Sequence, residues 1–396
     1  MAATRSTASI RSASRFRTPP ADATIRVEVF LGGAPLLEPK IGAGLLEFAR
    51  HHPRWRFSMR GPDFRYRASW LREQGISGVL VLIDDSSVSR VLNRAGVPWV
   101  YLLPAKQVQH PCVAVDDHAI GRMGAEFLLG RGFLRCAFCG AGTVWSDRRA
   151  EGFRATVEAA GRACQVVDIP FAQDRDWGLA SGASRWLRRW VAGLTPGTAV
   201  MAAHDTLANC LVDTCLQRGL RIPQDVAVLG VGNHDMLCQL SPVPISSVDT
   251  NVPLAAAQAA TLLGELIDGR TPAPPPLVQP GGIVERRSTE IVVYGDDLVA
   301  RVVAHIRSQA DAGTSVASLL RFFPVSRRTL SRRFARFVGH SPAAEIRQAR
   351  LRQARDMVKH SRLSLTEIAV TCGYADLPHM DRAFRRETGS IPSALR

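Results

Sequence analysis

Short apolar segments alternate with longer amphipathic segments from residue 25 to about residue 285, and this alternation constrains the fold more than any other feature. IRVEVFL (25–31) precedes IGAGLLEFARHH (41–52), and TAVMAAHD (198–205) precedes LANCLVDTCLQRGL (207–220). Runs of the first kind are typical of buried strands, and runs of the second kind of helices. A strand that is followed by a helix returns to the sheet as a parallel neighbour. The sequence therefore predicts an α/β body with helices on both faces of parallel sheets, where ligands bind beyond the carboxyl ends of the strands.

After residue 297 the apolar spacing becomes wholly helical. Two similar stretches, SRRTLSRRFARFVGHSP (326–342) and ADLPHMDRAFRRETGSIP (375–392), each place a Phe before basic residues, then a Gly, with a Pro three positions later. Ser326 has the character of a helix N-cap, and Gly-x-x-Pro ends one helix and starts the next segment. We predict two helix–turn–helix units braced by a long helix near 341–361, with Phe334 and Phe384 in their cores.

Positive charge is concentrated at the end of the chain. The net charge is +15, of which residues 297–396 carry +10 and residues 1–24 carry +3. A nearly neutral body with a basic last quarter favours one nucleic-acid-binding domain, although a solvated basic face is the alternative. Lysine occurs only three times, so the excess is arginine, which we attribute to a GC-rich genome.

Cysteine usage and hydropathy point to a reduced, cytoplasmic protein without a cofactor or a metal. The 8 cysteines lie mostly in apolar runs, and the CxxC of Cys136 and Cys139 has no second pair at zinc spacing. No stretch has the roughly 18 apolar residues of a membrane span. Residues 1–24 form a basic tail that lacks the apolar core of a secretory signal, so we expect a disordered tail or a misassigned start.

Two successive parts of the sequence resemble two different protein families. The segments VAVDDHAIGRMGAEFLLGRG, RRAEGFRATVEAAG and PQDVAVLGVGN resemble the sensor domain of lactose-repressor-type (LacI/GalR) regulators, which is similar to periplasmic sugar-binding proteins. This resemblance implies a two-lobed domain over 25–288, with three crossovers and the ligand between the lobes. A linker over 289–297 follows. Residues 298–396 resemble the AraC-type DNA-binding domain, whose signature is present as Ile368, Ala369, Gly373, Tyr374, Arg382, Phe384, Gly389, Pro392 and Arg396.

The sensor resemblance implies a set of sugar contacts at strand ends. Arg149 stands where a guanidinium grips ring hydroxyls, and Trp145 offers an apolar face to a sugar. His204 and Asp205 follow the TAVMAA strand, with a buried histidine and an N-capping aspartate as the alternatives. Asp116 is a weaker candidate. Gly232 stands where the family has an Asp, and Asn233 substitutes for that Asp in part.

Residues three to four apart on a helix share the face that enters the major groove, which gives the candidate base contacts. Arg328, Ser331 and Arg332 are the candidates of the first unit. Asp381 and Arg382 match the base-contacting positions of the resembled family, with Leu377 at the start of the same helix. The arginines expected to meet phosphates, or else to be solvated, are Arg327, Arg333, Arg336, Arg385 and Arg386.

The two resemblances together imply a transcription regulator, and the combination is similar to xylose-operon regulators. The implied partners are double-stranded promoter DNA, a monosaccharide such as xylose, RNA polymerase and a second copy of the chain in a homodimer. No enzyme is expected, since neither a GxSxG elbow nor an HExxH motif occurs. The alternatives are a sensor that no longer binds sugar, suggested by Gly232, and a sugar-binding transport protein.

Overall fold

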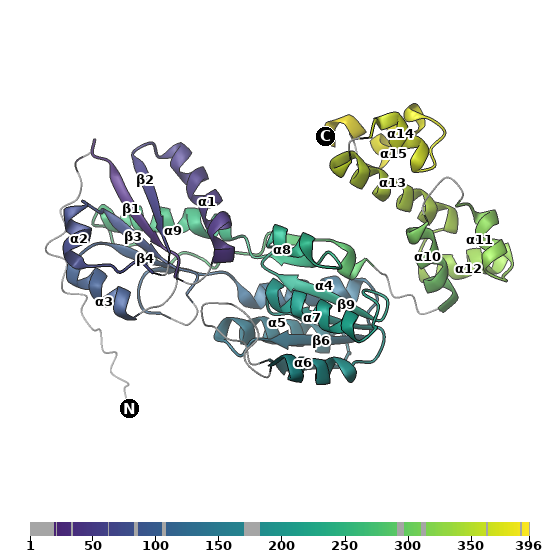
Figure 1. Cartoon of the computed structure of the whole chain (residues 1–396), viewed down its shortest axis with the longest axis horizontal. Coiled ribbons are helices and arrows are strands. Elements are labelled where there is room, and N and C mark those ends of the chain that lie inside the picture. The colour runs from purple at the N-terminus through teal and green to yellow at the C-terminus, as the bar shows by residue number, and fades with distance from the viewer. Residues whose placement is uncertain are drawn as a thin grey trace. The chain divides into compact units, whose positions relative to one another are not determined.

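The computed structural model describes residues 20–396, except for 21, 33–34, 62, 83–85, 105–107, 170–182, 291–296, 310–313, 362, 389 and 396. The chain divides into two compact units, 1–290 and 291–396. Most of the predicted tail (1–24) and of the predicted linker (289–297) lies outside the described residues. Figure 1 shows the α/β elements in the first unit and the helical elements in the second.

The first lobe of the sensor unit is a five-stranded parallel sheet with the order β2-β1-β3-β4-β5. Its strands are β1 (Ile25–Phe30), β2 (Trp55–Arg60), β3 (Gly78–Val81), β4 (Trp99–Leu102) and β5 (Cys112–Val113). Helices α1 (Glu38–His51) and α9 (Val252–Ile267) bury one face of the sheet, and α2 (Ala68–Glu73) and α3 (Ser86–Ala95) bury the other. Each face therefore has its own apolar core, as the alternation predicts.

The second lobe is a six-stranded sheet with the order β11-β10-β9-β8-β6-β7, in which only β11 is antiparallel. Its strands are β6 (Arg135–Gly140), β7 (Cys164–Asp168), β8 (Thr198–Ala202), β9 (Val226–Val231), β10 (Ser246–Asp249) and β11 (Gly282–Val284). Its helices are α4 (Asp117–Gly130), α5 (Val144–Ala159), α6 (Ala183–Ala192), α7 (Asp205–Gln217) and α8 (Asp235–Leu240). The described strands and helices confirm the predicted sheets.

Three chain crossings join the lobes, because β5 and α9 belong to the first lobe while α4, β10 and β11 belong to the second. Two of the crossings pair directly: Val115 bridges Val278, and the N–H of Asp116 donates to the carbonyl of Val278 at 2.9 Å. In the third crossing Asn251 adopts a left-handed conformation with φ of 58°, which Asn tolerates well. Gln279 ties the crossings together, because its amide donates to Asp116 and its carbonyl accepts from Asn251, so the two lobes share one hinge region.

The second unit is all helical. It contains α10 (Asp297–Ser308), α11 (Val316–Phe322), α12 (Arg327–Phe337), α13 (Pro342–His360), α14 (Leu365–Thr371), α15 (Leu377–Thr388) and the 3-10 turn η3 (Pro392–Leu395). Phe334 and Phe384 are fully buried in two separate cores, which confirms their predicted role. α13 lines both cores, with Ile346 in the first and Val358 in the second, and so braces the two helix–turn–helix units.

Two details differ from the sequence-based expectation. Strand β2 was not predicted, because WRFSMR mixes charged and aromatic residues and forms an edge of the sheet. Ser288 and Thr289, in the 3-10 turn η2 (Arg287–Thr289), are fully buried on β9 and β10, so the predicted end of the sensor at residue 288 lies inside a packed turn. No helix among the described residues is long and apolar enough to cross a lipid bilayer.

Candidate functional site

Asp117, Arg149 and Trp145 meet at the carboxyl edge of the second sheet. The Nε of Arg149 donates to the Asp117 carboxylate at 2.8 Å, and a second guanidinium nitrogen donates to the carbonyl of Ala203 at 2.6 Å. The guanidinium lies 4.7 Å from the centre of a Trp145 ring, a cation–π contact. Three helix starts, in α4, α5 and α7, thus contribute to one cluster.

Two glycines allow α4 and α5 to approach closely enough for this pair to form. A Cβ on Gly121 would lie 1.9 Å from the carbonyl oxygen of Arg149, and a Cβ on Gly152 would lie 2.1 Å from that of His118. Any larger residue at either position would push the helices apart. The backbone contact therefore fixes the register in which Arg149 meets Asp117.

His204 is the N-cap of α7 and faces the same cluster. Its Nδ1 accepts from the N–H of Leu207 at 3.3 Å, and its ring centre lies 5.9 Å from that of Trp145. Burial, together with the charge of Arg149 and the proximity of His234, lowers the pKa of His204 to about 3. The imidazole is therefore neutral at pH 7 and carries its proton on Nε2.

Asp205 is not the N-cap of α7, so the alternative role considered for it is wrong. It is the first residue of the helix and is fully buried. Its carboxylate accepts from the hydroxyl of Ser247 at 2.6 Å and from the N–H of His234 at 2.8 Å. Asp205 thus ties β10 to the turn between β9 and α8.

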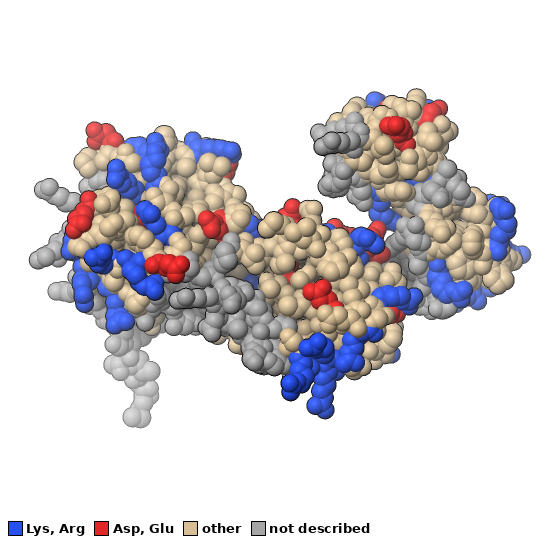
Figure 2. Space-filling model, in the orientation of Figure 1, with Lys and Arg blue, Asp and Glu red and all other residues tan. Residues whose placement is uncertain are grey.

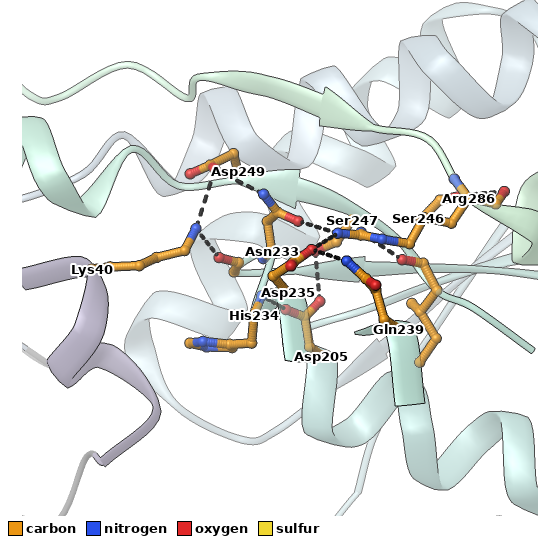
Figure 3. A network of polar contacts seen from close by, with 12 residues as sticks. Lys40, Asp205, Asn233, His234, Asp235, Gln239, Ser246, Ser247, Asp249 and Arg286 are labelled. Carbon is orange, nitrogen blue, oxygen red and sulfur yellow. Dashed lines mark hydrogen bonds and ion pairs between the residues drawn. The ribbon is translucent and has the colours of Figure 1, made fainter. Parts of the chain in front are cut away.

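The same turn carries a polar network that extends into the first lobe (Figure 3). The Asn233 amide donates to Asp249 at 3.0 Å and accepts from Arg286 at 2.9 Å. Lys40, in the first turn of α1, donates to the carbonyl of Gly232 at 2.8 Å and to Asp249 at 3.1 Å. Although burial raises the pKa of Asp249, its bonds to Asn233 and Asn251 and the charge of Lys40 hold it below the usual value. Both ends of the Asn233 amide bond to protein groups.

Asp116 serves the hinge. Its carboxylate accepts from the N–H of Ala119 at 2.8 Å as the N-cap of α4, and from the amide of Gln279 at 3.1 Å. The next residue, Asp117, is the one that faces Arg149. Burial raises the pKa of Asp117, against the opposing effect of Arg149.

Three residues at this edge were missed by sequence reasoning: Asp117, Lys40 and His234. The adjacent pair of aspartates signalled one acidic contact, but not which of the two it was. Lys40 and His234 meet from segments almost two hundred residues apart, so no local pattern points to them. Among the described residues, no group of three or more His, Cys, Asp or Glu side chains could hold a metal ion.

The predicted DNA-contacting residues of the first helix–turn–helix unit lie on α12. Ser326 caps this helix by accepting from the N–H of Thr329 at 3.1 Å, as predicted. The exposed residues of the helix include Arg327, Arg328, Ser331, Arg332 and Arg336, while Arg333 is half-buried. Figure 2 shows basic side chains gathered over α11 and α12.

The second helix–turn–helix unit presents a shorter basic face on α15. Arg382, Arg385 and Arg386 are exposed, and Asp381 is half-buried. Leu377 begins the helix and packs partly against the core of its own unit. Arg386 also pairs with Glu387 at 3.2 Å. Pro378 lies in the first turn, where a proline is tolerated.

Comparison with known proteins agrees with this division. A model of the periplasmic binding protein-like domain matches residues 125–289, and a model of the helix-turn-helix domain matches residues 319–396. The xylose operon regulatory protein of Escherichia coli (strain K12) is 29% identical over 345 residues, covering 84% of this chain and 87% of that protein. Its counterpart in Haemophilus influenzae is 24% identical over 350 residues, covering 84% and 88%.

Solved structures give the same picture. The structure of the xylose-binding transcription activator xylR superposes with a TM-score of 0.69 at 25% identity, covering 94% of this chain and 98% of that one. The lac repressor dimer bound to operator matches the fold of the sensor, with a TM-score of 0.51 at 18% identity over 68% of this chain and 95% of that one.

Fold and matches define a class: this chain is a helix-turn-helix transcription regulator with a periplasmic-binding-protein-like sensor in front of its DNA-binding domain. Within that class, the chain is similar over most of its length to the xylose operon regulatory proteins, and the match covers both of its domains.

Proposed function

We propose that the sensor binds a neutral monosaccharide, a pentose such as xylose, and that binding controls how the second unit engages promoter DNA. The cluster of Trp145, Arg149 and His204 supports this most directly. It combines an aromatic face, a fork of donors and a neutral imidazole at the carboxyl ends of parallel strands, where such sheets bind ligands.

Charge pairing favours a neutral ligand. The guanidinium of Arg149 is matched by the carboxylate of Asp117 at 2.8 Å, and Lys40 by that of Asp249 at 3.1 Å. A phosphate or sugar acid would have to compete with these carboxylates for each cation. A neutral sugar instead takes hydrogen bonds from the remaining N–H donors without breaking either pair.

One face of the Trp145 ring system carries the Arg149 guanidinium. A sugar would therefore stack its C–H groups on the opposite face, next to the edge occupied by His204. The carboxylate or amide groups of Asp205, Asp116 and Asn233 already bond to protein groups, so these residues are proposed to hold the neighbouring segments of the site in place.

The DNA side of the proposal assigns base contacts to Arg328, Ser331 and Arg332 on α12 and to Asp381 and Arg382 on α15. Arg327, Arg333, Arg336, Arg385 and Arg386 are assigned to phosphates. The active form is proposed to be a homodimer that contacts RNA polymerase as an activator, in the cytoplasm on nucleoid DNA. It acts as a regulator and carries out no enzymatic reaction.

Isothermal titration of the full-length protein tests the ligand class. D-xylose, L-arabinose and D-ribose are titrated beside gluconate and xylose 5-phosphate. At least one neutral pentose should bind, and Arg149→Lys should weaken that binding strongly, because an ammonium that bonds Asp117 and Ala203 lacks the planar guanidinium that stacks on Trp145 and has further N–H donors for a sugar. Binding of the anionic sugars alone, or of none of the five, would overturn the proposal.

A further inference from the structure

His234 lies in the turn at the carboxyl end of β9, next to Gly232, which has no side chain. Gly232 has a φ of +120°, and a Cβ built on it would lie 3.0 Å from Nε2 of His234 and 3.2 Å from the Asp205 carboxylate. The imidazole is half-buried and folds back over the glycine. The ring thus fills the position at the strand end that residue 232 leaves empty.

The same ring reaches the first lobe. It lies within hydrogen-bonding reach of the Leu36 carbonyl, in the 3-10 turn η1 (Pro35–Leu37) that follows β1. Lys40, four residues further on, grips the Gly232 carbonyl at 2.8 Å. Figure 3 shows Lys40 and the His234 ring on the side of the turn that faces α1. His234 therefore stands between the strand ends of the two lobes, where a ligand held between them must lie.

The electrostatic surroundings keep this ring neutral. Burial lowers the pKa of His234, and the charge of Lys40 lowers it further, while the carboxylates of Asp205 and Asp249 oppose the shift. A neutral imidazole has one N–H donor and one acceptor nitrogen. When the N–H donates to the Leu36 carbonyl, the other nitrogen presents a lone pair to a ligand.

An acceptor at this point complements the rest of the cluster. Arg149 and neutral His204 supply N–H donors, and the carboxylate of Asp205 is taken up by Ser247 and by the backbone of His234. Sugar hydroxyls need acceptors as well as donors. A single imidazole nitrogen accepts one hydroxyl, whereas a carboxylate can accept a vicinal pair.

We propose that His234 is a specificity-determining residue of the effector site, which accepts a hydrogen bond from one sugar hydroxyl while its N–H holds the first lobe. This inference rests on the proposed sugar response. It makes His234 the side chain that selects among pentoses differing at one hydroxyl, and that joins recognition to contact between the lobes.

The test is isothermal titration of the full-length protein and three variants with D-xylose, L-arabinose and D-ribose. His234→Phe keeps the ring but removes both nitrogens, and it should weaken the best pentose by roughly tenfold or more and flatten the ranking of the three. His234→Gln retains a donor and an acceptor at similar reach and should recover part of the loss. His51→Phe, on the exposed end of α1, is the control and should match the wild type.

The outcomes separate the two proposals. Pentose binding by the wild type with an unchanged ranking and affinity in a folded His234→Phe protein would refute the role of His234 and leave the sugar response intact. Failure of the wild type to bind any pentose would refute both. Should His234→Phe fail to fold, the comparison of His234→Gln with the shorter His234→Asn decides: equal affinities would contradict the inference.

Discussion

At the scale of single residues, the sensor is built around charges that are buried in pairs. Asp117 and Arg149 have side chains only 9% and 11% exposed, so neither charge has much water to stabilise it when the other is removed. Such a pair contributes less to net stability than it costs to break. Its value lies in holding the guanidinium in one orientation beside Trp145.

Arg149→Ala should lower the free energy of unfolding of the sensor by about 3–5 kcal/mol, because it leaves the Asp117 carboxylate buried without its partner. Arg148→Ala, the exposed neighbour, should change it by less than about 0.5 kcal/mol. Urea unfolding followed by tryptophan fluorescence measures the sensor specifically, since all 7 tryptophans precede the second unit. Equal effects of the two substitutions would contradict the pairing.

A second residue-scale prediction concerns pH. The pKa of His204 is about 3 in the folded protein and 6.5 in the unfolded chain, so between these values only the unfolded chain binds the proton. The stability contributed by neutral His204 is present above pH 6.5 and is lost as the pH falls toward 3, by at most about 1.4 kcal/mol per pH unit. His204→Asn, which can still cap α7, should lose stability less steeply between pH 7 and pH 5 in the same urea assay. Identical slopes would show that His204 does not titrate in this way.

At the scale of elements, four helices of the DNA-binding unit have a serine as their N-cap. Ser315, Ser326, Ser341 and Ser364 cap α11, α12, α13 and α14, and at α14 Glu367 completes a capping box. These caps fix where each helix starts, and hence which side chains of α12 share its exposed face.

Ser326→Ala should lower the stability of the second unit by about 1 kcal/mol, because the first turn of α12 loses its side-chain acceptor. Ser331→Ala, in the middle of the same helix and exposed, should leave stability unchanged. Thermal unfolding followed by circular dichroism of the full chain compares them. A loss of similar size in both would show that the cap is not the cause.

The exposed face of α12 should divide into base and phosphate contacts. Arg332→Ala should reduce discrimination between the DNA upstream of its own gene and a scrambled duplex by roughly 1–3 kcal/mol, whereas Arg336→Ala should weaken both duplexes equally and lower the salt dependence. Fluorescence anisotropy at several salt concentrations measures both. Equal loss on both duplexes for Arg332→Ala would make Arg332 a phosphate contact.

At the scale of the whole molecule, the end of the sensor is anchored next to the proposed effector cluster. Arg286 bonds to Asn233, and Ser288 and Thr289 are buried on β9 and β10, immediately before the chain continues into the second unit. A rearrangement of the turn at 232–234 would therefore displace Arg286 and the residues after it, which lead toward the DNA-binding domain.

Sugar and DNA binding should be reciprocally linked. If the sugar changes DNA affinity by some factor, DNA must change sugar affinity by the same factor, since both bias one equilibrium. Titration of the pentose with and without a saturating upstream duplex, and of the duplex with and without the pentose, checks the equality. Two independent affinities would mean that the units do not communicate.

Local pattern was enough to predict most of the fold. Strand and helix alternation, the buried Phe334 and Phe384 and the Ser326 cap depend on residues near each other in the sequence, and each was found where expected. Strand β2 was not predicted, because an edge strand need not be apolar throughout. Asp116 was chosen above Asp117 as the candidate contact. The start of α4 decides which of these two adjacent side chains faces Arg149, and the sequence does not fix the start of a helix to within one residue.

What the sequence determined by itself was the class of each unit and the helices that carry its charge, because periodicity, caps and charge distribution act over a few residues. The tertiary structure alone decided which groups meet at the proposed effector site. Lys40 reaches Gly232 and Asp249, and His234 approaches Leu36, only because the hinge brings the two lobes together. Hydrogen bonds act over about 3 Å whatever the sequence separation, so such contacts leave no periodic trace in the chain.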